Sequence, residues 1–360
     1  LDPATYGPNA CKGEERAAGN CNTINVFNSN LGGDTLWCRK RHLSFVTYFS
    51  EGVVDQNSAA FHCPHAGNPS AGICRDSEIT IGKNEKAFTH CDVAGNGAIA
   101  DCTDVGVTDA NIGNVLALLP DTIEIIFFNG NTGITNLPAG LFAGKPKLKA
   151  LYLNDCLIAD IDEDALAGLP DLEIFNIDAN QITAIPESLF ANNGELKQFS
   201  AFANPLTAIP EKLFHTTPGL ERLAIYDTKF YDPSGIGITK LEPDVFKGLT
   251  KLKIIALVNN GFDNDSFPEG VFDDLESLQF FDFFGNKLTK VPASWFGDWS
   301  SNVLRLAMWD NKITEIEAGA LGPLDSLEQA YFHINSLSDE EKIKLAEQVK
   351  DKENLVQLTV

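Results

Sequence analysis

The sequence predicts a right-handed α/β solenoid with one parallel concave sheet, preceded by a small, disulfide-bonded, mainly β domain. Three observations support this fold class. A pattern of apolar residues returns about every 24 residues from residue 123 onward, which is typical of stacked repeats. Seven of the eight cysteines lie before residue 103. At 360 residues, the chain is also longer than one compact core needs.

The first 105 residues are expected to form an oxidised module. Seven cysteines in a short segment favour disulfides, with one of the seven unpaired or paired elsewhere, and disulfides indicate an extracellular location. The candidates are Cys11, Cys21, Cys38, Cys63, Cys74, Cys91 and Cys102. A zinc site around His62 and His65 is the alternative, although paired CxxC spacings are missing. Alternating apolar residues at 43–49 and 79–81 predict short strands.

The repeats follow the pattern LxxLxLxxNxLxxLPxxLF, most clearly at 172–190 and 196–214. The turn position is occupied by Asn131, Cys156, Asn180, Asn204, Thr228, Asn260, Asn286, Asn311 and Asn335. Nine repeats are therefore predicted, and a tenth strand begins at 355–360. This pattern resembles the extracellular "typical" class of leucine-rich repeat proteins over roughly residues 120–360. The resemblance implies the solenoid fold and a role in non-covalent binding, without naming a ligand.

Each column of the pattern has a physical role. Alternation in LxxLxL points apolar side chains into the core and the intervening ones outward. The asparagine is expected to bond backbone groups of its own and adjacent coils. Cys156 and Thr228 are small polar substitutes at that position. Cys156 is therefore expected to be structural rather than nucleophilic. A buried convex spine is predicted from Phe142, Phe190, Phe214, Phe246, Phe272 and Phe296.

Three segments are expected: a cysteine-rich domain at 1–105, the solenoid with an N-terminal half-repeat at 106–337, and a terminal helix and strand at 338–360. Ser338 begins a capping box that predicts a helix to about Lys350. The strand at 355–360 is then an edge that another subunit could cover, so self-association at this end is one expectation. The chain opens on Leu1 rather than Met, which suggests a removed leader.

A candidate binding site comes from the outward position just after the third core residue of each repeat. In the fourth to ninth repeats this position carries Phe202, Tyr226, Val258, Phe284, Trp309 and His333. Small residues two positions earlier, such as Ala224 and Ala256, are expected to leave this stripe accessible. Asp227, Asp282, Asp310 and Tyr331 flank it and complete the predicted ligand-binding set.

The stripe has three possible interpretations. The aromatic residues could simply pack along the sheet as cross-strand ladders do. They could bind a protein, for which Trp and Tyr are frequent anchors, or a glycan, whose hydroxyls would bond Asp and Asn. Alternatively, the chain is a structural subunit of an extracellular layer or filament that assembles through the stripe and the solenoid end. A secreted or cell-surface adhesion module is the favoured function.

Two insertions interrupt the period near the stripe. Residues 229–236 must leave the solenoid as a loop, because core positions resume at Ile238 and Leu241. Residues 263–266 contain Asn264 in an Asn-Asp-Ser acceptor, so Asn264 is a candidate N-glycosylation site if the protein is secreted. Calcium binding there is disfavoured, because the full set of spaced ligands is missing.

Composition and motifs argue against other functions. The net charge is −23, and no basic cluster exceeds residues 39–41, so nucleic acid is not an expected partner. No apolar run approaches the ~18 residues of a membrane span. GxSxG, P-loop and HExxH motifs are missing, and no nucleophile lies near His333 in the pattern, so catalytic residues, metals and cofactors are not expected.

Overall fold

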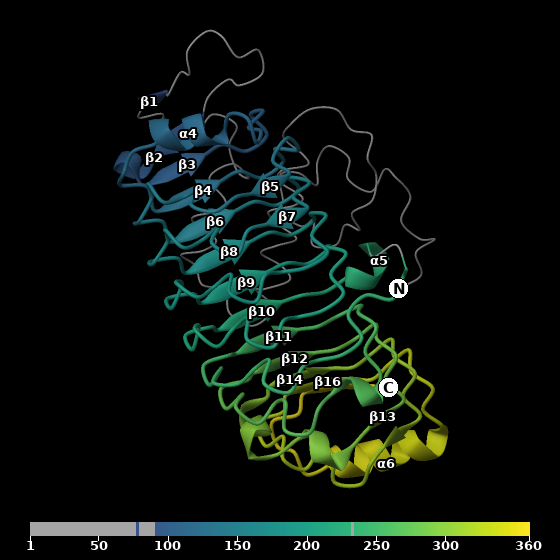
Figure 1. The fold of residues 1–360 in the computed structure, drawn as a ribbon. Coiled ribbons are helices and arrows are strands. Elements are labelled where there is room, and N and C mark those ends of the chain that lie inside the picture. Colours follow the sequence, from purple (N-terminus) through teal and green to yellow (C-terminus); the bar gives the residue numbers. More distant parts are fainter. Residues whose placement is uncertain (1–76, 79–90, 232–233) are drawn as a thin grey trace, which may run out of the picture. The chain divides into compact units, whose positions relative to one another are not determined.

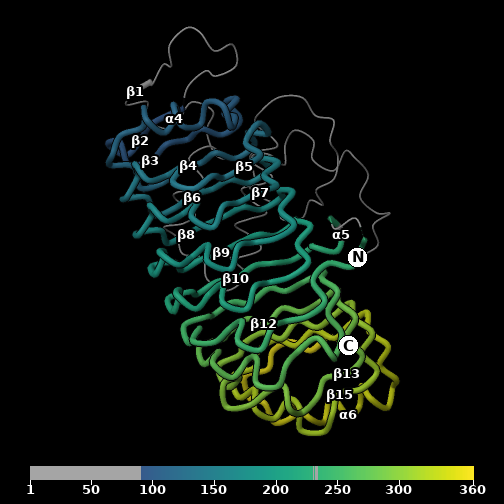
Figure 2. The backbone as a smooth tube through the Cα atoms, in the orientation of Figure 1, coloured from purple at the N-terminus to yellow at the C-terminus, as the bar shows by residue number. Residues whose placement is uncertain are grey.

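The structure is a computed structural model, and it describes residues 77–78, 91–231 and 234–360. Coils wind in one direction and stack, as Figure 2 shows. Each coil contributes one short strand to a single 13-stranded sheet (Figure 1). In sheet order the strands are β1 (Ser77–Glu78), β2 (Asp92–Ala94), β3 (Ile99–Asp101), β4 (Ile125–Phe127), β6 (Ala150–Tyr152), β8 (Ile174–Asn176), β9 (Gln198–Ser200), β10 (Arg222–Ala224), β11 (Ile254–Ala256), β12 (Phe280–Asp282), β14 (Arg305–Ala307), β16 (Gln329–Tyr331) and β17 (Gln357–Thr359). From β3 onward all pairs are parallel, so the predicted solenoid is confirmed.

The core lies between this sheet and the opposite, convex wall. The convex spine is confirmed, since its phenylalanines are at most 4% exposed. Neighbouring rings touch: Phe190 and Phe214 stack with centroids 6.2 Å apart, and Phe246 and Phe272 stack at 6.1 Å. Two short parallel sheets lie outside the main one, β5 (Asn136–Leu137) with β7 (Asp160–Ile161) and β13 (Lys290–Val291) with β15 (Glu315–Ile316). One continuous apolar core therefore runs through the repeats.

A ladder of asparagines ties successive coils together. The Asn180 Nδ2 donates to the carbonyls of Leu153 and Ile177, both at 2.8 Å. Its Oδ1 accepts from the backbone N–H of Cys156 at 3.0 Å and of Ile158 at 2.9 Å. At the substituted position, the buried Cys156 thiol donates to the Phe128 carbonyl at 3.2 Å. Asn180 thus satisfies buried backbone groups of two coils.

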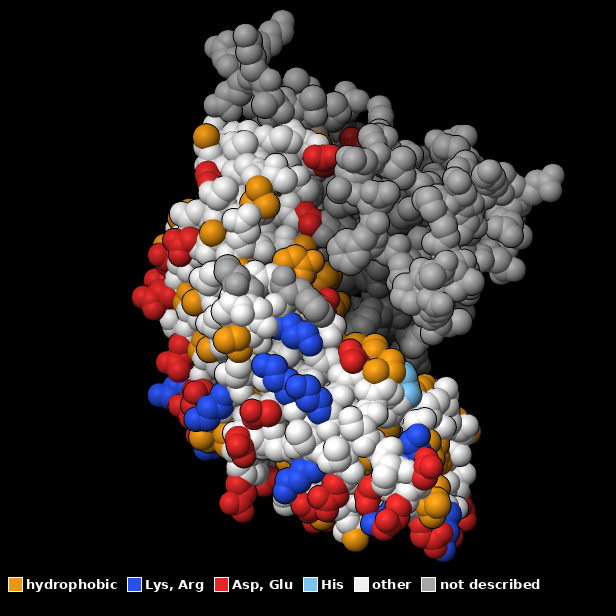
Figure 3. Space-filling model, turned by 90° about the vertical axis from the view of Figure 1, so that its right-hand side faces the viewer, with side chains coloured by type: hydrophobic (Ala, Val, Ile, Leu, Met, Phe, Trp, Pro, Cys, Tyr) orange, Lys and Arg blue, Asp and Glu red, His pale blue; other side chains and the backbone are white. Residues whose placement is uncertain are grey.

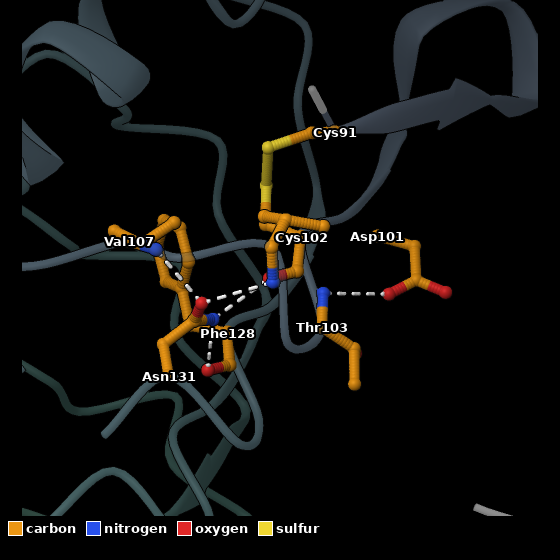
Figure 4. The surroundings of a disulfide bond; sticks show 8 residues. Cys91, Asp101, Cys102, Thr103, Val107, Phe128 and Asn131 are labelled. Carbon is orange, nitrogen blue, oxygen red and sulfur yellow. Dashed lines mark hydrogen bonds between the residues drawn. A yellow bond between two sulfur atoms is a disulfide. The ribbon is translucent and has the colours of Figure 1, made fainter. Parts of the chain in front are cut away.

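The first coil is closed by an antiparallel hairpin. Strands β2 and β3 pair with Asp92 opposite Asp101, and a Cys91–Cys102 disulfide joins the two residues just beyond that pair. Asn131 of the next coil donates to the Cys102 carbonyl at 2.7 Å (Figure 4). The main sheet is therefore continuous across residue 105, where the cysteine-rich domain was expected to end. The other predicted disulfide cysteines, Cys11, Cys21, Cys38, Cys63 and Cys74, lie outside the described residues.

Helices complete the coils at three places. Helix α4 (Ile112–Leu118) supplies the expected half-repeat, with Ile112, Val115 and Leu116 buried. The first inserted loop opens with a short helix, α5 (Thr228–Tyr231). Helix α6 (Asp339–Val349) follows Ser338, whose hydroxyl accepts from the Glu341 N–H at 3.2 Å. The final strand, β17, follows this helix. Within the described ranges, no helix is long and apolar enough to span a membrane.

Candidate functional site

The outward face of the main sheet, called the concave face here, carries the predicted stripe as two stacks of rings. Phe202 and Tyr226 stack with centroids 4.7 Å apart and an interplanar angle of 5°. Phe284 and Trp309 stack at 4.1 Å and 13°, and Trp309 and His333 continue at 5.3 Å and 8°. All five side chains are half-buried. The parallel register of the strands brings the stacked neighbours together although they are 24 or 25 positions apart.

Stacking determines which part of each ring a ligand can reach. Trp309 lies between Phe284 and His333, so neighbours cover both of its faces. For Trp309, the ring edge is therefore the part that these neighbours leave uncovered. Edges carry the positive part of the aromatic quadrupole and pack well against apolar side chains and other rings. We name the two groups the N-terminal stack (Phe202 and Tyr226) and the C-terminal stack (Phe284, Trp309 and His333).

Val258 separates the two stacks and differs from the prediction, because its side chain is only 1% exposed. The inserted loop contributes here. Lys229 follows Thr228 at the start of α5, and its ammonium donates to the carbonyl of Gly285 two coils further on. Burial lowers the pKa of Lys229, whereas the charges of Asp310 and Asp227 act to raise it. The lysine therefore bridges the coil that contains Val258, and the stripe is interrupted rather than continuous.

The flanking acidic residues Asp227 and Asp310 occupy turn positions that have a left-handed backbone conformation. Their φ angles are 62° and 52°, in the left-handed region that Asp, Asn and Gly adopt most readily. Asp227 accepts from the Asn259 amide at 2.6 Å, and burial raises the pKa of its carboxyl. Asp310 is exposed. The left-handed backbone therefore gives a reason for Asp at these two positions other than the ligand binding that the sequence pattern predicted.

Asp282 and Tyr331 are engaged within the sheet. Asp282, 2% exposed, receives two bonds from Arg305: Nε to Oδ1 at 3.2 Å and Nη2 to Oδ2 at 2.8 Å. The Arg305 guanidinium also lies 4.7 Å from the centre of the Phe280 ring. The Tyr331 hydroxyl donates to Gln357 at 3.0 Å. The Asp282 carboxylate therefore neutralises an internal cation, a partner that spacing along the sequence could not reveal.

The N-terminal coils show a further stacked pair that the stripe did not include. Phe127 and Tyr152 stack at 4.8 Å and 14°, two residues before the stripe column. Burial raises the pKa of the Tyr152 phenol to about 12. Both rings are visible in the sequence as consecutive aromatic residues in one outward column. Lys229, by contrast, could not have been identified, because its contact depends on the path of the inserted loop.

Asn264, the candidate glycosylation site, has a structural role in the fold. Its Oδ1 accepts from the Thr289 N–H and the Thr289 hydroxyl, both at 2.8 Å, and its Nδ2 donates to the Lys290 carbonyl at 2.8 Å. The Ser266 side chain of the acceptor motif is bonded to Asp263 at 2.9 Å. A glycan on Nδ2 would compete with the bond to Lys290. No group of three or more His, Cys, Asp or Glu residues in the described part of the chain is placed to hold a metal ion.

The stacked coils, the asparagine ladder and the long parallel sheet define a leucine-rich repeat protein. The family described as Leucine rich repeat matches residues 124–182. Podocan of Mus musculus is 28% identical over 123 residues, which are 34% of this chain and 18% of podocan. Lumican of Gallus gallus is 32% identical over 102 residues, 28% of each chain. The chain is thus distantly related to small leucine-rich proteoglycans and spans less than a third of the length of these two relatives.

Among solved structures, a leucine-rich repeat protein of Leptospira interrogans superimposes with a TM-score of 0.58 and 19% identity. The match covers 68% of this chain and 57% of the Leptospira protein. At this identity the likeness concerns the fold alone.

Proposed function

We propose that the chain is an extracellular recognition module that binds a protein partner through the ring edges of its concave face. The observation that carries this proposal is the pair of ring stacks, which place half-buried aromatic side chains in register on neighbouring strands. Partly exposed Trp, Tyr and Phe side chains gathered in one patch are the usual anchors of protein interfaces. Packing of the aromatic side chains against one another is compatible with this proposal, because stacked rings still present their edges to a ligand.

The stacking geometry favours a protein over a glycan. A sugar engages an aromatic residue by laying its C–H groups over the face of the ring. In the C-terminal stack both faces of Trp309 are covered, so this mode is closed at the centre of the patch. Apolar side chains of a protein need no ring face, because they pack against ring edges. The available surface therefore fits a protein.

Two observations support an extracellular location. The Cys91–Cys102 disulfide is of the kind that persists in oxidising compartments. The distantly related small leucine-rich proteoglycans are extracellular matrix proteins. Binding at the concave face would then occur in extracellular fluid or at a cell surface.

The test uses the immobilised chain to retain material from its native extracellular fluid, with and without enzymatic removal of glycans. A Phe284→Ala, Trp309→Ala double variant removes two rings of the C-terminal stack. An Ile343→Ala variant is the control, because it truncates a side chain that is 70% exposed on α6, away from the stacks. Thermal unfolding of each variant checks that the fold is kept.

We expect the wild-type chain and the control to retain the same protein after glycan removal, and the double variant to lose it. Retention that disappears when glycans are removed would instead identify a glycan ligand. If the chain retains only copies of itself, and its mass in solution rises with concentration, it is a structural subunit. Equal retention by the folded double variant would contradict any role of the stacks in binding.

A further inference from the structure

The sequence contains four Asn-Gly dipeptides, in which an asparagine side chain is best able to react with the main chain. Glycine has no side chain, so it neither shields its own nitrogen nor restricts rotation of the main chain. The four lie at 96–97, 129–130, 193–194 and 260–261, all within the described residues. The side-chain carbonyl carbon of the asparagine must reach the glycine nitrogen, so the surroundings of each asparagine decide whether it reacts.

Three of the four asparagine side chains are held in place. Asn193 and Asn260 are fully buried. Their Nδ2 atoms donate to main-chain carbonyls of the preceding coil, at 2.7 Å and 3.0 Å respectively. Asn129 is half-buried, and its Oδ1 accepts from the Asn154 N–H at 3.0 Å. Each of the three would have to break these bonds before it could react.

Asn96 is the exposed member of the set, and it lies at the tip of the hairpin between β2 and β3. Its side chain makes no hydrogen bond with the other described residues. Glycine precedes and follows it, and the φ angles of Gly95, Asn96 and Gly97 are 63°, 55° and 86°. No neighbouring side chain of this turn therefore restrains or covers the reacting groups.

We propose that Asn96 is a site of spontaneous deamidation in the folded protein. The Gly97 nitrogen loses its proton to solvent and attacks the Asn96 Cγ. An N–Cγ bond forms, the Cγ–Nδ2 bond breaks, and Nδ2 leaves as ammonia with a proton from solvent, so that a cyclic imide closes. Water then opens the imide. Attack at Cγ restores the ordinary main chain and leaves aspartate, whereas attack at the main-chain carbonyl carbon breaks its bond to Gly97 and leaves an isoaspartyl linkage through Cβ and Cγ.

The aspartate product fits the turn. Four aspartates of this chain already have φ between 52° and 62°, namely Asp104, Asp155, Asp227 and Asp310. The added negative charge is also a small change on a protein of net charge −23, and Figure 3 shows acidic side chains along much of one face of the described coils. The charge of the product is therefore not what disturbs the fold.

The isoaspartyl product lengthens the main chain within a turn that has little room for it. The Ala98 N–H donates to the carbonyls of Ala94 and Gly95, both at 3.2 Å. The Ala98 carbonyl accepts from the N–H groups of Glu124 at 2.7 Å and Ile125 at 3.0 Å, which belong to the next coil. Turn length determines the register of a hairpin, so an inserted carbon displaces Ala98 from these partners. The hairpin that closes the first coil thus loosens as the protein ages.

The test follows the four asparagines by peptide mapping and mass spectrometry while the whole chain is incubated at neutral pH, folded or unfolded in urea. In the folded chain we expect Asn96 to deamidate about tenfold or more faster than Asn129, Asn193 and Asn260, because those three react only from rare opened states. In urea we expect this difference to disappear. Equal rates in the folded chain would overturn the inference. A difference that persists in urea would also overturn it, because the neighbouring sequence would then be the cause.

Amide hydrogen exchange at Glu124 and Ile125 tests the effect on the hairpin. The isoaspartyl form of the incubated chain, separated by chromatography, is compared with a fresh Asn96→Asp variant, which has the same charge and an ordinary main chain. We expect these two amides to exchange about tenfold faster in the isoaspartyl form. An incubated Asn96→Gly variant, which fits the turn and cannot deamidate there, should keep slow exchange and controls for other changes with age. Equal exchange in the isoaspartyl form and the Asn96→Asp variant would refute the loosening of the hairpin.

Discussion

Replacing Asn180 by Ala should destabilise the solenoid more than any exposed substitution on the concave face. The shortest bonds of the side chain are two to backbone carbonyls and two to backbone N–H groups, at 2.8 to 3.0 Å. Without it, the Leu153 carbonyl and the N–H groups of Cys156 and Ile158 lose the partner that Asn180 provides, whereas the Ile177 carbonyl keeps its bond from Asn204 at 2.9 Å. At about 1 kcal/mol for each bond, the loss is about 4 kcal/mol, and neighbouring water cannot replace the bonds in a closed core. Such a change is a large share of the stability of most domains.

The assay is urea unfolding combined with hydrogen exchange at the Cys156 and Ile158 amides. Both amides lose their acceptor in the variant, so they should exchange faster than the other amides of their coil. Asn335→Ala is a suitable comparison, because Asn335 is only half-buried and its loss should cost less. A destabilisation below about 1 kcal/mol for Asn180→Ala would refute the claim that the ladder holds the coils together.

Three further predictions concern other parts of the fold. Asp282→Ala leaves the Arg305 cation without its carboxylate at a nearly buried position, so we expect a loss of about 3 kcal/mol in chemical unfolding, and a loss near zero would contradict the ion pair's structural role. Removing the 11-residue Cys91–Cys102 link with a Cys91→Ala, Cys102→Ala variant should lower stability by about 3 kcal/mol, with the earliest exchange in β2 and β3; unaltered exchange there would argue against the hairpin as a cap. The phenol of Tyr152 has a folded-state pKa of about 12, above the ordinary value of 10.0, so its neutral form stabilises the fold below pH 10 and this contribution is lost as the pH rises toward 12. Stability of the wild type should fall across that window by about 2 kcal/mol more than that of Tyr152→Phe, and parallel curves would refute the shift.

Features set by a local repeat could be predicted from the sequence. The strand residues, the Phe190 column and the asparagine turn follow from the 24-residue spacing, because each repeat makes the same contacts with its neighbours. The terminal helix after Ser338 follows from local capping chemistry. The ring stripe was also visible as a column, since register in a parallel sheet places equivalent residues side by side.

Features that depend on contacts between unlike repeats could not be predicted. The bond from Lys229 to the Gly285 carbonyl, across the coil of Val258, depends on an inserted loop whose path no periodicity specifies. The pairing of Asp282 with Arg305 joins different outward columns. An aspartate that resembles a ligand-binding group therefore forms an ion pair within the protein. Stacking of Phe284, Trp309 and His333 decides that edges rather than faces are available, and ring orientation cannot be deduced from spacing.

The left-handed turn beside the stripe has a consequence for redesign. Positions 203, 227, 259, 285 and 310 carry Ala, Asp, Asn, Gly and Asp with φ between 51° and 71°. At the equivalent position of the next coil, the branched Ile334 has a φ of 57°, a conformation that is strained for its side chain. The preceding residue in each coil, from Phe202 to Trp309, has no such restriction. On the proposed function, each coil therefore offers one position that can be varied to change what is bound, next to one where Gly, Asn, Asp or Ala fits the left-handed turn with less strain. A combinatorial library for a new ligand should randomise the first column and leave the second untouched.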